Sequence, residues 1–368
     1  MLRKDEKILI YPYFNAEFPV AKQLIREGFE VHIASYEGTG LIGKDVAFSV
    51  NREKCNVKVS VYSNHLLDLS DVIYIPNISK KNLRRNEMDE ILLRAMKNDK
   101  KIISAVELDG DFPNVLEYDN FIDLGCATNF KINSYYNRIN NNKMRFFTPK
   151  IPVIYIGGIH DLMDNQYITI SLKHLLEGNG YKVCCLTIMN SLKLFGCISF
   201  PKEFSNIGET IENRIIYLNN FIRSCVENMR PDILLIHIPD GMMRYNDYFT
   251  NSFGGFAFMI SQAVKSDYFI CTVVTEMSSL EYYDRLSNYF NRKFDSPINC
   301  LHFSNSLLDI PNSSRPTSGD LLFKNELEID EFIDGLSKLK GRHNYKMLNL
   351  FKDESLELLF DDILNKLG

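Results

Sequence analysis

Short apolar segments that alternate with helical segments constrain the fold of this chain more than any other feature. Residues 7–35 and residues 153–186 follow one plan of strand, loop, helix, glycine and strand. Gly28 and Gly178 stand where the helices end, as a left-handed helix cap prefers. Strands that are apolar along their whole length and separated by helices are typical of parallel sheets buried on both faces.

Further apolar runs of strand length lie at residues 57–62, 72–76, 101–106, 232–238, 269–274 and 299–303. The 368 residues suffice for two cores. The sequence therefore predicts an α/β fold of two doubly wound, mostly parallel-sheet domains. We expect a Rossmann-like domain over residues 1–140, a P-loop-like domain over residues 150–325 and a helical tail over residues 326–368. The polar stretch 136–152 marks the boundary between the two domains.

Charge and hydropathy exclude several classes of function. The formal net charge is −5, and no segment concentrates basic residues. A nucleic-acid footprint is therefore not expected. The charged N-terminus lacks the apolar core of a signal peptide, and no apolar run reaches the length of a membrane span. We expect a cytoplasmic protein with no membrane partner.

The cysteine pattern does not indicate a metal centre. None of the eight cysteines forms a Cys-x-x-Cys pair, and most lie in apolar runs. Free cysteine behaves there as a small apolar residue. We therefore expect neither zinc, an iron–sulfur cluster nor disulfides, and the sequence predicts no cofactor.

A glycine turn after the strand at residue 153 has the layout of a phosphate-binding loop. Gly157 and Gly158 end the strand, and a helical stretch follows. A working loop ends in Gly-Lys-Ser/Thr, in which the lysine meets the phosphates and the hydroxyl holds magnesium. Asp164, Asn165 and Gln166 stand at those positions. The loop is therefore degenerate, and the chain is expected not to hydrolyse nucleotides.

Ligands of doubly wound sheets bind beyond the carboxyl ends of the strands. In the second half this rule selects Gly157, Gly158, His160, Asp161, Asp164, Asn165, Pro239, Asp240 and Glu276. His160, Asp161 and Asp240 could together hold a divalent metal, although ordinary polar loop residues are the favoured interpretation. His237 lies inside a predicted strand, so we expect a buried histidine of the core there.

The first half offers two weaker candidate sites. A glycine loop follows its second strand and could wrap a ligand through Gly40, Gly43, Lys44 and Asp45, with Lys44 on an anion. Another strand runs into three carboxylates, which could bind metal or act as acid and base. Turn chemistry explains them as well and is favoured. These carboxylates belong to Glu107, Asp109 and Asp111.

Residues 245–258 are rich in Tyr and Phe, with Thr250 and Asn251 between them. Such a mixture forms either an aromatic groove for a peptide or a helix that packs its aromatic stripe into the core. Both alternatives stay open. In the groove alternative, exposed apolar contacts would come from Met242, Met243 and Phe249.

Several motifs together resemble a known family. They are the degenerate loop and residues 39–45, 230–243, 249–254 and 260–264. The chain resembles, to about residue 305, the clostridial peptide maturation system proteins. These are encoded beside a Cys-rich bacteriocin-like precursor and a radical SAM enzyme that modifies peptides. The second domain is also distantly similar to P-loop domains of the dethiobiotin-synthetase type. The resemblance implies a pathway but no catalytic residues.

Three functions follow as expectations. The first is an accessory protein of ribosomal peptide maturation that binds the precursor peptide, the radical SAM enzyme or a small ligand. The second is a P-loop-derived kinase, ligase or group-transferase that acts on a carboxylate or peptide. The third is a sensor that binds nucleotide without turnover. A positive charge near the loop would distinguish them, and the candidates are Lys44, Lys173 and Arg244.

Overall fold

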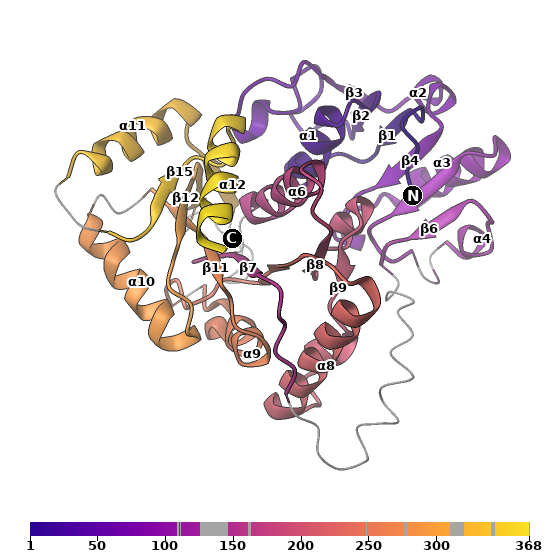
Figure 1. Cartoon of the computed structure of the whole chain (residues 1–368). Coiled ribbons are helices and arrows are strands. Elements are labelled where there is room, and N and C mark those ends of the chain that lie inside the picture. Colours follow the sequence, from indigo (N-terminus) through magenta and orange to yellow (C-terminus); the bar gives the residue numbers. More distant parts are fainter. Residues whose placement is uncertain are drawn as a thin grey trace, which may run out of the picture. The chain divides into compact units, whose positions relative to one another are not determined.

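In the computed structural model, the chain folds into two compact units (Figure 1). The first domain comprises Met1–Ala127 with Met189–Gly196, and the second comprises Thr128–Ile188 with Cys197–Gly368. The structure describes residues 1–108, 110, 112–125, 146–160, 163–247, 249–275, 279–309, 320–339 and 343–367.

The first domain is built on a six-stranded parallel sheet of order β3-β2-β1-β4-β5-β6. This is the strand order of the Rossmann fold, with its switch point between β1 and β4. The strands are β1 (Ile8–Ile10), β2 (Val31–Ser35), β3 (Val59–Val61), β4 (Val72–Ile75), β5 (Lys101–Ser104) and β6 (Phe121–Asp123).

Helices cover both faces of this sheet. Leu67, Met88 and Ile91 belong to a buried cluster that joins α2 and α3 to the strands, while α1 packs beside β2. The helices are η1 (Asn15–Glu17), α1 (Phe18–Arg26), η2 (Phe48–Val50), α2 (Asn64–Leu69), η3 (Lys80–Asn82), α3 (Arg85–Lys97) and α4 (Pro113–Leu116).

A segment from much later in the chain completes the first domain. It contains η4 (Asn190–Phe195). The Asn190 side-chain amide donates to the Ala105 carbonyl over 3.0 Å, and the buried Lys193 ammonium donates to the Leu124 carbonyl. These carbonyls follow β5 and β6, so η4 is fixed at the carboxyl edge of the sheet.

The second domain contains a seven-stranded parallel sheet of order β15-β12-β11-β7-β10-β8-β9. A separate antiparallel pair is formed by β13 and β14. The strands are β7 (Val153–Gly158), β8 (Val183–Thr187), β9 (Ile198–Ser199), β10 (Ile233–His237), β11 (Tyr268–Val274), β12 (Cys300–Ser304), β13 (Ser306–Asp309), β14 (Asp320–Phe323) and β15 (Lys346–Leu348).

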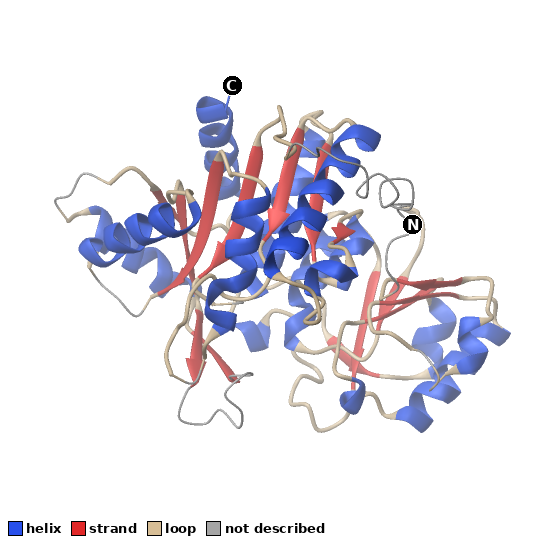
Figure 2. Ribbon diagram, turned by 90° about the horizontal axis from the view of Figure 1, so that it is seen from below, coloured by secondary structure: helices blue, strands red, loops and turns tan. Residues whose placement is uncertain are grey.

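Helices again lie on both faces of the sheet (Figure 2). On one face, α6 and α12 pack together, and the Tyr268 hydroxyl donates to Asp362 of α12 over 2.6 Å. The domain also contains α7, α8, η5, α9, α10 and α11. The bounds of these helices are α6 (Met163–Gly178), α7 (Lys202–Ser205), α8 (Ile211–Met229), η5 (Asn251–Gly254), α9 (Gly255–Ala263), α10 (Leu280–Phe294), α11 (Glu326–Ser337) and α12 (Asp353–Leu367).

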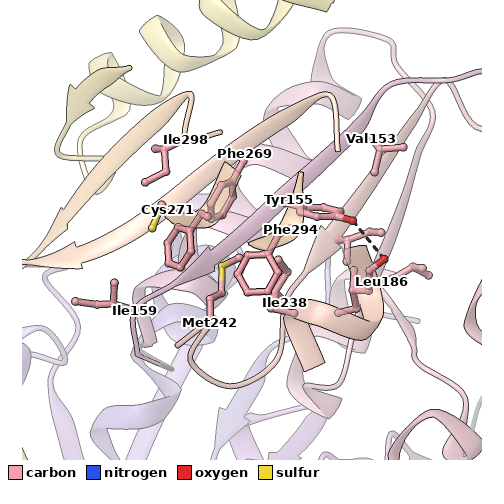
Figure 3. Packing of buried hydrophobic residues seen from close by; sticks show 14 of the residues in the cluster. Val153, Tyr155, Ile159, Leu186, Ile238, Met242, Phe269, Cys271, Phe294 and Ile298 are labelled. Atoms are coloured by element: carbon pink, nitrogen blue, oxygen red, sulfur yellow. Dashed lines mark hydrogen bonds between the residues drawn. The ribbon is translucent and has the colours of Figure 1, made fainter. Parts of the chain in front are cut away.

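The core of the second domain lies between its sheet and α8 to α11. Tyr155, Phe269 and Phe294 are fully or almost fully buried there (Figure 3). The Tyr155 hydroxyl donates to the Val264 carbonyl, so the polar end of this ring is satisfied inside the core. Side-chain caps mark where helices begin. At the start of α8 the hydroxyl of the N-cap residue Thr210 accepts from the Asn213 backbone amide over 3.1 Å.

The predicted α/β fold with two mostly parallel sheets is confirmed. The tail contains the helices α11 and α12, but β15 between them extends the second sheet beside β12. In the part of the chain that the structure describes, no helix is long and apolar enough to cross a membrane.

Candidate functional site

The glycine turn at the end of β7 is tightly packed. A Cβ atom added to Gly157 would lie 2.8 Å from the Met242 sulfur, and one added to Gly158 would lie 2.7 Å from the Thr272 carbonyl oxygen. The Met242 amide also donates to the Gly158 carbonyl over 2.9 Å. Both glycines are thus required by the close approach of neighbouring segments.

Asp164 lies buried in the first turn of α6 and pairs with a distant histidine. Its Oδ2 is 3.0 Å from Nε2 of His302 on β12. The Leu350 amide donates to Nδ1 of the same ring over 3.1 Å. Because a backbone amide can only donate, Nδ1 is the acceptor and Nε2 carries the hydrogen that Asp164 receives. The first turn of α6 therefore holds a carboxylate of the protein itself.

Asn165 takes the position at which a phosphate-binding loop has its lysine. Its side chain is fully buried, and its Oδ1 accepts from the Thr272 hydroxyl over 2.6 Å. Its Nδ2 has no hydrogen-bond partner among the described residues. A neutral amide that is turned toward the sheet cannot replace the charge of a lysine.

Each of the three basic candidates is engaged in another contact. Lys173 pairs with Glu177 over 2.6 Å and lies ten residues beyond the start of α6, which is about 15 Å along the helix. The exposed Arg244 pairs with Asp247. Lys44 belongs to the first domain, where its ammonium lies 4.2 Å from the centre of the Phe48 ring.

The strand β10 pairs with β7, as expected for the strand that leads to the next acidic loop. It ends in the buried His237, whose Nδ1 lies 3.0 Å from the Thr187 hydroxyl. Burial lowers the pKa of His237 to about 4, so the imidazole is neutral near pH 7. The expectation of a buried histidine is confirmed, although its Nε2 lacks a partner within the described residues. Asp240 is half-buried, and its Oδ1 accepts from the Gly241 amide over 2.9 Å.

The loop after β7 and the long connection between β10 and α9 meet at the carboxyl edge of the second sheet. The Asn251 amide group donates to the Ile159 carbonyl over 2.9 Å and to the Met243 carbonyl over 2.8 Å. The His160 ring lies edge-on to Tyr245 and Phe249, with centroids 6.0 and 5.7 Å away. The structure thus brings together the loops that the sequence analysis selected. Whether a ligand binds there stays a prediction.

The expected exposure of apolar residues at this edge was wrong for two of the three. Met242 and Phe249 are buried, and Met242 belongs to the main core cluster. Met243 is partly buried and packs against the same cluster, and Thr250 is half-buried before η5. An aromatic stripe predicts a core and a groove equally well, and here most of these side chains are buried in the core.

The backbone of η5 is unusual. Asn251, Ser252, Phe253 and Gly254 have φ angles of 47, 48, 54 and 71°. A Cβ atom at Gly254 would lie 2.1 Å from the Met242 carbonyl oxygen, so only glycine fits. The Phe253 side chain nevertheless remains 62% exposed. We call these four residues the Phe253 turn.

A buried carboxyl group also lies at the switch point of the first domain. Glu17 is the last residue of η1, which follows β1, and occupies the N-cap position of α1. It accepts from the Asn77 amide over 3.0 Å and from the Tyr74 hydroxyl over 3.3 Å. Burial raises the pKa of Glu17 to about 7. Sequence reasoning missed this residue, whose one signal is its place where a Rossmann domain has its phosphate-binding glycines.

The glycine loop of the first domain, which follows β2, folds against β3. Gly40 and Gly43 have φ angles of 73 and 78°, and the Gly43 amide donates to the Val59 carbonyl over 2.8 Å. Asp45 accepts from the Ala47 amide over 2.9 Å. These contacts stabilise the loop without a ligand, and the predicted binding role is not tested by them.

Several candidates lie outside the described residues. They are Asp109, Asp111, Asp161 and Glu276. Glu107 is described and exposed. Within the described ranges, no group of three or more His, Cys, Asp or Glu side chains could hold a metal ion, and the seven cysteines found there are free.

The fold and these loops define a class of protein with a Rossmann-like domain and a P-loop-like domain. No family model and no curated protein matches the sequence. A DUF1611 family protein from Anabaena variabilis has a similar structure, with a TM-score of 0.59 and 11% sequence identity over 98% of this chain and 100% of that one. The likeness shows a shared fold across both domains.

Two other solved structures are more distant. A plasmid partition protein from Borrelia burgdorferi has a TM-score of 0.34 and 15% identity, over 59% of this chain and 100% of that chain. An amine dehydrogenase from Mycobacterium smegmatis has a TM-score of 0.22 and 12% identity, over 61% of this chain and 62% of that chain. TM-scores of this size carry no argument about fold or function.

Proposed function

We propose that this chain is an accessory protein of a ribosomal peptide maturation system that binds its partner without hydrolysing nucleotide. The partner is the precursor peptide, the radical SAM enzyme or a small ligand. One observation carries the proposal: each domain places a buried carboxyl group at the start of the helix that follows its first strand. These groups belong to Glu17 and Asp164.

The start of that helix is where both kinds of domain normally bind phosphate, because free backbone amides and the helix dipole attract an anion. The Asp164 carboxyl group already lies there, and as a carboxylate it would repel a triphosphate. Loss of the lysine contact weakens phosphate binding by roughly 2–3 kcal/mol, or about thirty- to a hundredfold. The site thus favours binding of something other than magnesium–ATP.

The choice of pathway rests on the resemblance of the sequence motifs to peptide maturation system proteins. An enzyme derived from a P-loop protein is the second candidate, favoured by the β7–turn–α6 layout and by β10 as the neighbour of β7. The two candidates differ in whether ATP is turned over.

Two experiments separate them. Purified protein with magnesium–ATP should show no turnover above the buffer, whereas stoichiometric hydrolysis that disappears in Asn165→Ala would promote the enzyme. A Cys-rich precursor and a radical SAM enzyme, where they are encoded beside this chain, would also be co-expressed with and without it, and the modified peptide measured by mass spectrometry. We expect a several-fold loss of modified peptide without the chain, and an unchanged yield would reject the accessory role.

A further inference from the structure

We propose that the Phe253 turn is a peptide-docking element, which inserts the Phe253 ring between side chains of an acidic, apolar peptide segment. This inference rests on the proposed function, since it names the surface by which the accessory protein would hold its peptide. The occupant is defined by chemistry: an aliphatic or aromatic side chain close to a carboxylate.

The backbone of the Phe253 turn is strained. A left-handed backbone costs roughly 1–2 kcal/mol for an ordinary residue, and Ser252 and Phe253 both adopt it. The turn persists because Asn251 ties it to two carbonyls and Gly254 fits against Met242. Strain of this kind, held by surrounding contacts, gathers at sites that bind ligands.

The Phe253 turn presents an aromatic ring to solvent. Phe253 is 62% exposed, although the adjacent core buries another aromatic residue of the same edge, Phe249. Tyr289 of α10 is also exposed, at 42%. Lys293 connects the two, because its ammonium donates to the Phe253 carbonyl over 2.9 Å and lies 5.4 Å from the centre of the Tyr289 ring. The cation of Lys293 therefore lies beside the exposed Tyr289 ring and is tied to the backbone of the Phe253 turn.

Positive charge lies next to the Phe253 turn. Lys293 contacts only a carbonyl and aromatic rings, and neither it nor the exposed Arg292 pairs with a carboxylate in the described part of the chain. Other exposed cations of this domain do have such partners, among them Lys265 with Asp295. Two uncompensated cations beside exposed rings complement a peptide that carries a carboxylate next to an apolar side chain.

A bilayer surface is the less favoured occupant. Attachment to anionic lipid needs a larger basic cluster, since each Lys or Arg contributes only about 1 kcal/mol. Here two cations stand on a chain of net charge −5. A single fixed ring suits a pocket between peptide side chains better than it suits a membrane.

The test uses the full chain and two peptide probes. The first probe is the synthetic precursor peptide, and the second is an array of octapeptides in which Leu or Phe stands beside Asp or, as the counter-set, beside Lys. The variant is Phe253→Asn, since asparagine tolerates the left-handed backbone and removes the ring. Phe48→Asn is the matched control, because Phe48 is a similarly exposed ring, at 58%, in the first domain.

We expect Phe253→Asn to weaken binding of the acidic octapeptides at least tenfold, with Phe48→Asn within twofold of the unchanged protein. Lys293→Gln should abolish the preference for Asp over Lys in the array. Equal binding of both peptide sets, or acidic binding that is unaffected by Phe253→Asn, would overturn the docking element. Binding to anionic vesicles but to no peptide would overturn it in favour of a membrane.

The precursor arm separates this inference from the proposed function. Acidic octapeptides that bind through Phe253 while the precursor does not bind would reject the pathway and keep the docking element. A precursor that binds equally to the unchanged protein and to Phe253→Asn would keep the pathway and reject the element.

Discussion

Single residues decide what the two helix starts can hold. Glu17 and Asp164 occupy equivalent places in their domains, yet their charge is stabilised differently. Asp164 receives a hydrogen from the His302 ring, whereas Glu17 has one backbone amide and one hydroxyl as donors. Burial without a cation favours the protonated form of Glu17.

Glu17 should make the first domain less stable at higher pH. Its pKa is about 7 in the folded chain and near 4.5 when unfolded, so the folded state binds more protons between these values. The stabilisation is complete below pH 4.5 and is lost as pH rises to 7, by about 3 kcal/mol. Glu17→Gln should remove this slope in urea unfolding monitored at several pH values. An unchanged slope in the variant would show that another group causes it.

The sequence predicted the residues of the second site better than their environment. Asp164 was selected because it follows a strand that ends in two glycines. Its partner His302 was not, since it lies 138 residues away inside an apolar strand and only the fold brings them together. Met242 and Phe249 were placed at the surface because a stripe of large apolar residues does not reveal which side is covered.

Among the elements, the strands were the most predictable. Short runs of β-branched residues between helical segments leave little choice for a sheet buried on both faces. β15 escaped prediction because three residues between two helices give no periodicity to read. It is placed by pairing with β12 and by α12, which packs on α6.

The start of α6 depends on the pair between Asp164 and His302. His302→Ala should destabilise the second domain by roughly 3–5 kcal/mol, because a buried carboxylate loses its donor. Asp164→Asn should cost less, since a neutral amide oxygen still accepts from the ring. Adding Asp164→Asn to His302→Ala should therefore recover part of the loss. Urea unfolding of the three variants measures this, and a double variant no more stable than His302→Ala would contradict it.

At the scale of the whole molecule, the two domains should respond to pH in opposite directions. The folded pKa of His237 is about 4 and lies below its ordinary 6.5, so the unfolded state binds more protons between these values. The second domain therefore gains stability as pH rises to 6.5, while the first loses it through Glu17.

Calorimetry between pH 4.5 and 7.5 should resolve two transitions whose midpoint temperatures shift in opposite directions as the pH rises. Glu17→Gln should flatten the shift of one transition, and His237→Asn that of the other. A single transition that responds to both substitutions would show that the two domains unfold as one unit.

The η4 segment has a consequence for synthesis. Because Asn190 and Lys193 belong to the first domain, that domain is interrupted in the chain by β7, α6 and β8. The ribosome must synthesise β7, α6 and β8 before the first domain can form its contacts with η4. The N-terminal half therefore cannot complete its folding before these elements have been made. A gene fragment that stops at residue 127 lacks this closing segment, and one that stops at residue 196 carries it together with β7 and β8, two of the seven strands of the second sheet.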